Sequence, residues 1–406
     1  MAGILGPGFI KEFDRNKKML IGIDLLWVRP NICGGTESAT RNLINGFGMY
    51  DDKNEYILFV GRDTVDTFTQ YRGYSNIRIE ICDVDSMKRI KRIAWENSHL
   101  DKLARSLNVD MMFIPVYSKP KSLSIEKGGI PYITMIYDLQ ALHFPEYFSA
   151  ARIMFFKRSW KRACETSAKI VTSSNYSKDD ITEHFPSAKD KISVIYSPII
   201  VTDDDEAASD KDSQNDAHEN TEEILGKYGV EKDGYYYTVS SMLPHKNLDT
   251  LIKVMSKLQG NPDKEVKLLV SGVGGNKEEF DRKVEEAGVK DVIIDTGFVS
   301  DEERDTLYRN CSLFLFASTF EGLGMPPVEA MMQGAKVVTT KCASLEEVTR
   351  QKANYVDDPT DVDEWIKRIG EAEKQEKKSY TFSEYSLEHS TNRYIELFNS
   401  VYNTNN

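Results

Sequence analysis

Short apolar runs alternate with longer amphipathic segments along most of this 406-residue chain. In the first half these runs predict strands at 19–26, 56–60, 77–81, 111–114, 132–136 and 169–172, and the run at 192–200 leads towards a hinge. Strands of this kind, separated by helical stretches, indicate parallel sheets covered by helices on both faces. Since the chain is too long for one typical core, we expect two doubly wound α/β domains.

Changes in composition predict where the domains begin and end. The predicted division is 1–200, 201–224, 225–382 and 383–406. Within the second of these, 203–223 contains ten acidic residues, one lysine and few apolar groups, so we expect a mobile linker or insertion. In the last, the aromatic stretch 394–402 predicts a final helix, and 1–18 is expected to be a short extension before the first strand.

The segment 313–330 combines a strand, a glycine loop and a helix start. The apolar run 313–317 predicts a buried strand, Gly322 and Gly324 allow a tight turn, and the pair Pro326-Pro327 suits a first helical turn. The unpaired amides and positive dipole end of that helix form an anion site suited to a diphosphate.

Two acids flank this loop at E-x7-E spacing. Glu321 is expected in the loop, facing a ligand, and Glu329 on the first helical turn. The alternative is an ordinary surface loop, with acids placed by the preference of a first turn for negative charge.

Two further motifs occur in the second half. The stretch 236–248 predicts a strand and a loop that carries Lys246 before a helix, and 295–300 predicts a turn that leads into a capped helix at 300–303. With the glycine loop, these motifs make residues 235–348 resemble the C-terminal domain of the retaining glycosyltransferases of family 4, which have the GT-B fold. The resemblance implies two Rossmann-like domains facing across a cleft, with the last helix crossing back to the first domain.

The resemblance also implies roles for the domains and for particular residues. Residues 1–200 would bind the acceptor and 225–382 the nucleotide sugar. Lys246 would bind the donor diphosphate, the turn at 298–299 the nucleobase, and Glu329 the ribose hydroxyls. The expected donor-binding residues are Gly34, Gly35, Ser240, Ser241, Lys246, Phe298, Val299, Glu321, Leu323, Gly324, Met325 and Glu329, and the expected catalytic residues are Asp138, Glu321 and Lys246.

One departure from the family lies beside the lysine. Many relatives have arginine where this chain has Ser241, and some where it has His245. Diphosphate stabilisation would then depend on Lys246, on helix-end amides and on a protonated His245 beside phosphate. The alternatives are a solvated lysine at a helix start and a packed histidine.

The N-terminal half supplies two further candidate sites. The loop 31–38 contains Gly34 and Gly35, and by resemblance it lies near the donor phosphate and the acceptor; a plain turn before a helix is the alternative. Asp138 follows an apolar strand, where open α/β sheets place ligands, and His143 comes five residues later, either facing the cleft or packed. Many relatives have histidine where this chain has Tyr137.

The implied reaction transfers a sugar from a nucleotide diphosphate to an acceptor hydroxyl with retained configuration. Lys246 and helix-end amides would stabilise the departing diphosphate, and Glu321 would orient sugar hydroxyls. Asp138, with His143, would position or deprotonate the acceptor, unless the leaving phosphate takes that proton. Domain closure would exclude water.

The composition of the chain limits the classes of ligand and partner that it could bind. A net charge of −12 argues against nucleic acid, and five scattered cysteines without a C-x-x-C pair suggest neither zinc nor disulfides and fit a reducing cytosol. No apolar run reaches the length of a membrane span, and the amino end does not resemble a secretory signal. We expect no cofactor and no metal, although the sequences at 83–85 and 361–363 both match the D-x-D motif of metal-dependent enzymes.

Two basic segments with aromatic residues, 86–95 and 152–162, stand out in this acidic chain. They indicate either contact with an anionic membrane surface or, since Ile153, Phe156, Trp160 and Ala163 share a face, a helix packed on its own sheet. Membrane contact would imply a lipid-linked saccharide acceptor, polysaccharide or glycolipid assembly, and a place at the inner face of the cell membrane. Two other functions remain open, a GT-B sugar-nucleotide epimerase and a catalytically silent GT-B subunit of a transferase complex.

Overall fold

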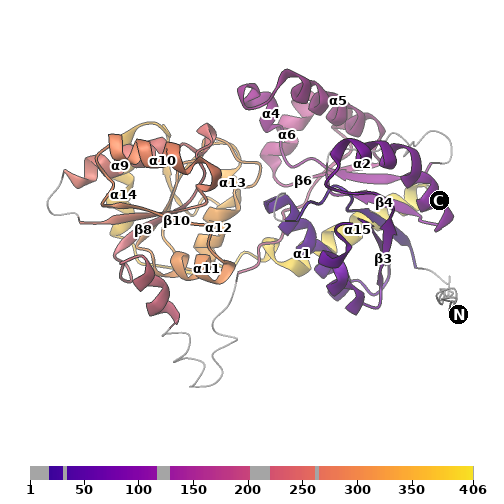
Figure 1. Ribbon diagram of the computed structural model, residues 1–406, viewed down its shortest axis with the longest axis horizontal. Helices are drawn as coiled ribbons and strands as arrows, with labels where there is room; N and C mark the ends of the chain where they lie inside the picture. The colour runs from indigo at the N-terminus through magenta and orange to yellow at the C-terminus, as the bar shows by residue number, and fades with distance from the viewer. Residues whose placement is uncertain (1–17, 31–33, 117–128, 202–219, 261–264, 406) are drawn as a thin grey trace, which may run out of the picture.

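The computed structural model describes residues 18–30, 34–116, 129–201, 220–260 and 265–405. Most of the predicted N-terminal extension, loop residues 31–33 and most of the acidic segment 203–223 lie outside these residues. The described chain forms two lobes, each built around a parallel sheet with helices on both faces (Figure 1). The predicted pair of Rossmann-like domains is therefore confirmed.

The N-terminal sheet has seven strands in the order β3-β2-β1-β4-β5-β6-β7. All neighbouring strands pair in parallel, and the strand order reverses between β1 and β4. The strands are β1 (Leu20–Asp24), β2 (Glu55–Gly61), β3 (Ile77–Cys82), β4 (Met111–Ile114), β5 (Tyr132–Met135), β6 (Lys169–Thr172) and β7 (Ile192–Val194). Their continuous apolar sequences reflect burial on both faces, which is why the pattern located the first six within a few residues.

The C-terminal sheet has six parallel strands in the order β10-β9-β8-β11-β12-β13. Its strands are β8 (Tyr235–Val239), β9 (Lys267–Ser271), β10 (Ile293–Gly297), β11 (Leu313–Phe316), β12 (Val337–Thr340) and β13 (Asn354–Val356). The order reverses between β8 and β11, and the loops after these two strands carry Lys246 and Glu321. Ligands in open α/β sheets bind at such a reversal, outside the carboxyl ends of the strands.

Helices connect the strands of each sheet. The N-terminal helices are α1 (Gly35–Tyr50), α2 (Arg89–Trp95), α3 (Asp101–Ser106), α4 (Gln140–His143), α5 (Ala150–Thr166) and α6 (Asn175–His184). The C-terminal helices are α9 (Leu248–Gln259), α10 (Lys277–Glu286), α11 (Asp301–Asn310), α12 (Met325–Met332), α13 (Leu345–Val348), α14 (Val362–Glu373) and α15 (Leu387–Asn405).

The last helix, α15, returns to the N-terminal lobe and packs beside α1 (Figure 1). Its buried face includes Tyr394 and Phe398, whose rings lie 5.3 and 5.6 Å from the ring of Phe113 on β4. Phe398 is also 5.6 Å from Phe47 on α1. The predicted crossing of the C-terminal helix is therefore confirmed, and α15 completes the core of the other domain.

Helix α5 packs its predicted apolar face on its own domain. Phe156, Trp160 and Ala163 are buried, and the rings of the first two stack at 5.4 Å, whereas Ile153 is only half-buried. Packing on the sheet therefore accounts for this face of α5.

The two domains contact each other at the carboxyl edges of their sheets. Ser174, the residue that caps α6, donates a hydrogen bond of 2.6 Å to the carbonyl of Gly322, and Ser173 and Ser177 approach the same oxygen at 3.3 Å. The carboxylate of Glu347 on α13 accepts from the backbone N–H groups of Asn175 and Tyr176 at 2.8 and 3.1 Å. The glycine loop that contains Gly322 and α13 thus contact the amino end of α6.

Candidate functional site

Lys246 ends the 3₁₀ turn η5 (Pro244–Lys246), and Asn247 separates it from the start of α9. Its Nζ lies 2.6 Å from Oε1 of Glu321, and the two side chains are 24% and 13% exposed. A half-buried ammonium beside the start of a helix can hold a phosphate as a point charge. The structure therefore brings together two of the predicted catalytic residues, 75 positions apart in the sequence.

The glycine loop after β11 fits closely against the N-terminal domain. A β-carbon at Gly322 would lie 2.8 Å from Oδ2 of Asp138 and 3.1 Å from the carbonyl oxygen of Tyr137. Gly324 has a φ of 77° and immediately precedes α12, where Pro326 and Pro327 occupy the first turn as predicted. The loop therefore needs glycine at Gly322 for close approach and at Gly324 for backbone conformation.

Asp138 completes a group with Lys246 and Glu321. It follows β5, and its Oδ1 accepts a hydrogen bond of 3.0 Å from the backbone N–H of Gln140. Burial raises the pKa of Asp138, and the charge of Glu321 raises it further, while the Gln140 hydrogen bond and Lys246 lower it. A carboxyl group with a raised pKa close to a lysine is suited to exchanging a proton with an acceptor hydroxyl.

His245 packs between the domains, and its expected role as a protonated group beside phosphate stays a prediction. Its Nε2 lies 3.0 Å from Nε2 of Gln140, and its ring is 5.5 Å from Phe144 and 5.8 Å from Tyr147. Burial and, to a lesser extent, the charge of Lys246 lower the pKa of His245 to about 4 against the opposing charge of Glu321, so the ring is neutral at physiological pH. Lys246 is accordingly the cation of this loop.

Glu329 lies one turn later than expected. Because α12 begins at Met325, Glu329 is its fifth residue and belongs to the second turn. Its Oε2 accepts from the hydroxyl of Tyr308 at 3.0 Å and lies 3.7 Å from Nε of Arg304, both on α11. Burial raises the pKa of Glu329 while Arg304 lowers it. These two partners, which the motifs did not identify, orient the carboxylate.

Around the expected nucleobase site, Phe298 follows β10 with its side chain 86% exposed. A β-carbon at Gly274 would lie 3.4 Å from the ring of Phe298. Gly274 belongs to the glycine-rich loop 272–275 after β9, in which Gly272 and Gly274 have positive φ. The spelling Gly-Val-Gly-Gly directly after an apolar strand is a signal for a ligand loop that the sequence reading missed.

The remaining donor candidates lie on the loops around this group. Ser240 is buried and its N–H donates to the carbonyl of Ser271, Ser241 is half-buried, Val299 packs on the core, and Leu323 is 8% exposed. In the N-terminal loop Gly34 has a φ of 57°, and a β-carbon at Gly35 would lie 3.6 Å from Cε of Met325. Of the predicted glycine pair, Gly35 therefore lies against the start of α12.

His143 is held at the domain interface. Its Nε2 contacts both carboxylate oxygens of Asp180 at 2.9 and 3.0 Å, and its ring lies 4.9 Å from Phe320. Its side chain is 31% exposed. Tyr137, at the position of the family's histidine, is half-buried, and burial raises the pKa of its phenol, so it remains protonated.

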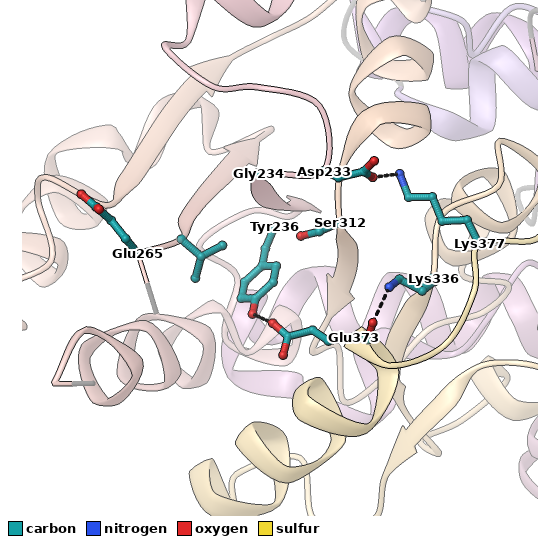
Figure 2. A pocket seen from close by; sticks show the side chains of 9 residues that line it. Asp233, Gly234, Tyr236, Glu265, Ser312, Lys336, Glu373 and Lys377 are labelled. Atoms are coloured by element: carbon teal, nitrogen blue, oxygen red, sulfur yellow. Dashed lines mark hydrogen bonds and ion pairs between the residues drawn. The ribbon is translucent and has the colours of Figure 1, made fainter. Parts of the chain in front are cut away.

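A cavity lies elsewhere, at the amino ends of the C-terminal strands, with a volume of about 540 Å³ (Figure 2). Four of its charged residues have partners within the domain. Asp233 pairs with Lys377, Lys336 donates to the carbonyl oxygen of Glu373 at 3.0 Å, and the hydroxyl of Tyr236 donates to the Glu373 carboxylate. It is thus a polar surface hollow, on the opposite edge of the sheet from Lys246.

The acids of the two D-x-D triplets have local contacts. Asp83 pairs with Arg62, Asp85 pairs with Lys88, and Asp361 caps the amino end of α14. Among the described residues, no group of three or more His, Cys, Asp or Glu side chains is arranged to hold a metal ion. Nor does that part of the chain contain a helix with both the length and the apolar character to cross a membrane.

Two family models match this chain. The model "Glycosyl transferases group 1" matches 220–389, and "Glycosyltransferase Family 4" matches 33–202. The two matches together cover both lobes of the structure.

Curated relatives include the O-antigen chain mannosyltransferase B of Escherichia coli and the O-antigen chain mannosyltransferase RfbU of Salmonella typhimurium. The first is 29% identical over 232 residues, which is 57% of this chain and 58% of the relative. The second is 24% identical over 250 residues, which is 62% of this chain and 63% of the relative. The chain therefore spans somewhat under two thirds of these relatives.

Solved structures with the same fold cover almost the whole chain. A glycosyltransferase from Rickettsia africae superposes with a TM-score of 0.65 at 16% identity, covering 95% of this chain and 99% of that structure. Anabaena HepE in complex with UDP superposes with a TM-score of 0.62 at 16% identity, covering 94% and 100%.

Proposed function

Because the chain belongs to family 4 of the glycosyltransferases and has the GT-B fold, we propose that it transfers a sugar from a nucleotide-diphosphate sugar to an acceptor hydroxyl with retained anomeric configuration. The observation that carries this proposal is the convergence of Lys246, Glu321 and Asp138 where the two domains meet. Its curated relatives act as mannosyltransferases, so a mannosyl donor is the first to test. HepE binds UDP, which supports a nucleotide donor.

In the proposed reaction the bond between the anomeric carbon and the diphosphate oxygen breaks, and a bond to the acceptor oxygen forms. The ammonium of Lys246 and the amides at the start of α12 stabilise the negative charge that develops on the diphosphate. Glu321, already paired with Lys246, orients the sugar hydroxyls and balances positive charge on the ring. No metal is needed, because these groups supply the positive charge.

The acceptor hydroxyl loses its proton as the new bond forms. Asp138 accepts that proton or orients the hydroxyl while the leaving phosphate accepts it. His143 is a positioning residue, since its imidazole is bonded to Asp180 at the interface. The contact of Gly322 with Asp138 brings the donor loop and the acceptor side together, which excludes water from the activated sugar.

We further propose a lipid-linked saccharide acceptor and peripheral membrane contact in polysaccharide or glycolipid assembly. Exposed Met87 and Ile90, beside the basic residues of α2, and exposed Met154 on α5 support this, since they leave apolar side chains uncovered next to cations. The buried face of α5 is not available for such contact.

A screen of UDP-, GDP- and ADP-sugars for thermal stabilisation, followed by slow hydrolysis, tests the donor assignment. One donor should raise the melting temperature and be hydrolysed, and Lys246→Ala or Glu321→Ala should lower turnover by about 10²- to 10³-fold. Lys253→Ala, an exposed lysine on α9, is the matched control and should retain activity. Epimer formation from donor alone would identify an epimerase, and donor binding without turnover a silent subunit.

A further inference from the structure

A second cavity lies in the N-terminal domain, at the carboxyl edge of its sheet. Its volume is about 140 Å³, and it is lined by residues of β1, of α2 and its preceding loop, of α5 and of the segment after β4. Asp24 ends β1, and β1 is separated from β5, which leads to Asp138, by only one strand. With neighbouring strands about 4.8 Å apart, the cavity and Asp138 open on the same edge of the sheet.

Four arginines line this cavity in a chain of net charge −12. They are Arg29, Arg89, Arg92 and Arg152, and the accompanying acids are Asp24 and Glu96. Arg92 pairs with Glu96 at 3.1 Å, while the other three arginines have no ion pair with a described residue. Bringing four guanidinium groups to one cavity is unfavourable unless an anion compensates their repulsion.

Aromatic rings hold two of these guanidinium groups. Arg89 lies over the ring of Phe155 at 5.6 Å, so α2 and α5 meet above the cavity, and Arg152 lies over Phe148 and Phe156 at 5.0 and 5.3 Å. A guanidinium stacked on a ring keeps the N–H groups at its edge available. The stacking therefore orients both arginines without using their hydrogen bonds.

Two buried donors beside the cavity lack acceptors. Ser86 is 1% exposed and its Oγ has no hydrogen-bond partner, and Nε of Arg92 is likewise unpaired among the described residues. Buried polar atoms in folded proteins are almost always paired, so two unpaired atoms in the wall of one cavity are an unusual feature of this region. Burial raises the pKa of Asp24 to about 6 and that of Glu96 to about 8, so at neutral pH Asp24 is mainly ionised, Glu96 is mainly protonated, and the four arginines still leave the cavity with an excess of positive charge.

We propose that this N-terminal pocket, lined by Ser86, Arg89, Arg92 and Arg152, binds a phosphate group of the acceptor. The inference rests on the proposed function, since it names the chemistry of that function's acceptor. Arginine forks match phosphate oxygens in geometry and charge. The phosphate belongs either to a lipid headgroup or to a soluble phosphate ester, and the pocket recognises the chemistry common to both.

The test uses the full chain with hexyl phosphate as the soluble probe, measured by calorimetry. Affinity should fall about tenfold or more in Arg89→Gln/Arg152→Gln, the loss of roughly one charge-assisted hydrogen bond or more. The matched control Arg158→Gln removes an exposed arginine of α5 outside the pocket and should retain the affinity, as should Lys246→Ala at the donor site. Circular dichroism verifies folding, and the single variant Arg152→Gln, at an exposed position, serves if the double variant is unstable.

Vesicles of phosphatidylcholine with and without phosphatidic acid distinguish the source of the phosphate. If the protein cosediments only with vesicles that contain phosphatidic acid, and the double variant does not, the pocket binds a lipid phosphate. If the protein binds hexyl phosphate but does not cosediment, the pocket binds a soluble phosphate ester. The proposal would be overturned if the double variant bound hexyl phosphate as tightly as the wild type, or if Arg158→Gln lost as much affinity as the double variant. Loss of affinity in Lys246→Ala alone would overturn it as well. Thermal stabilisation of the wild-type protein by a nucleotide sugar is measured separately. Failure of the proposed function can therefore be distinguished from failure of the phosphate-pocket proposal.

Discussion

Gly322 is the point at which the donor loop and the N-terminal domain come closest. Its carbonyl accepts from Ser174, and its α-carbon leaves no room for a side chain beside Asp138. A single atom added there would act on both contacts at once, although neither belongs to the core of a domain. A substitution at Gly322 should therefore disturb the geometry of the site while leaving the stability of the two domains nearly unchanged.

We predict that Gly322→Ala lowers the transfer rate by about 10²-fold, because a displacement of the loop by about 1 Å disturbs the reacting geometry. The melting temperature should change little, since the two sheets and their cores are untouched. Steady-state kinetics and thermal melts measure both effects. The control Gly370→Ala lies in α14 with nothing within 4 Å of its added carbon, and should be slightly stabilising. Full activity in Gly322→Ala would contradict this role of the loop.

We predict an unusual dependence of the free energy of unfolding on pH, because Asp24 and Glu96 are buried acids with raised pKa values. Burial and, to a lesser extent, the charge of Asp24 raise the pKa of Glu96 to about 8 against the opposing charge of Arg92. The folded state therefore holds a proton that the unfolded chain releases near its ordinary pKa of 4.5, and stability falls as pH rises from there to about 8.

Glu96→Gln mimics the protonated carboxyl and should remove this loss. Relative to the wild type, the variant should gain at least about 1 kcal/mol in unfolding free energy between about pH 5 and pH 8. Urea titrations at several pH values measure the difference. Glu80→Gln, a half-buried acid on β3 outside the pocket, is the control and should follow the wild type. If the difference in unfolding free energy between Glu96→Gln and wild type stayed constant across this pH range, the raised pKa of Glu96 would be contradicted.

Helix α15 shows how an element from one end of the chain completes the core at the other. Phe398 is fully buried among Phe47, Phe113 and Tyr394. These rings belong to three elements that are distant in sequence, so no local pattern specifies their contact. The N-terminal domain depends on this helix for part of its hydrophobic core.

We predict that Phe398→Ala destabilises the N-terminal domain by about 3–5 kcal/mol, through lost burial and the cavity left behind. The exposed position Asn392, on the same helix, provides the control Asn392→Ala, which should change stability little. Hydrogen exchange resolves the domains: protection should fall in β1 and β4, while β8 and β11 keep theirs. Uniform loss in both sheets would mean that the two domains unfold as one unit.

The sequence predicted elements well wherever burial produced continuous apolar runs. The bounds of β4 and β6 agree with the prediction, and the cap at Ser300 is confirmed by its acceptance of the Glu303 N–H. The start of α12 was placed too late for Glu329, because the proline pair can occupy several positions of a first turn. The catalytic and binding roles of these residues stay predictions.

Contacts between the domains could not be predicted, since they join polar residues without periodicity. Ser174 and Glu347 carry no motif, yet they link α6 to the other domain. The same holds for the arginine-lined cavity, where a strand end and two helices converge. The basic segments were noted in the sequence, but their meeting above one pocket depends on the fold.

At the level of the whole molecule, Glu347 links the relative position of the domains to the site. Its carboxylate accepts from two backbone N–H groups at the amino end of α6 and from Nδ2 of Asn175 and the hydroxyl of Tyr196, at 2.8 to 3.1 Å. Charge-assisted hydrogen bonds at a helix amino end are stronger than neutral ones. The arrangement of the domains that brings Gly322 to Asp138 is therefore stabilised by a residue outside the group formed by Lys246, Glu321 and Asp138.

We predict that Glu347→Ala shifts the molecule towards an open arrangement, at a cost to closure of about 1.5–3 kcal/mol, which changes the populations by about tenfold or more. The radius of gyration from small-angle scattering should rise in the absence of donor. A saturating donor, which binds where the domains meet, should reduce the difference from wild type, because it favours the closed state by its differential affinity. Glu346→Ala, the neighbouring acid on α13, is the matched control and should scatter as the wild type does. If the variant keeps the wild-type radius while losing activity, Glu347 acts on the site by a route other than closure.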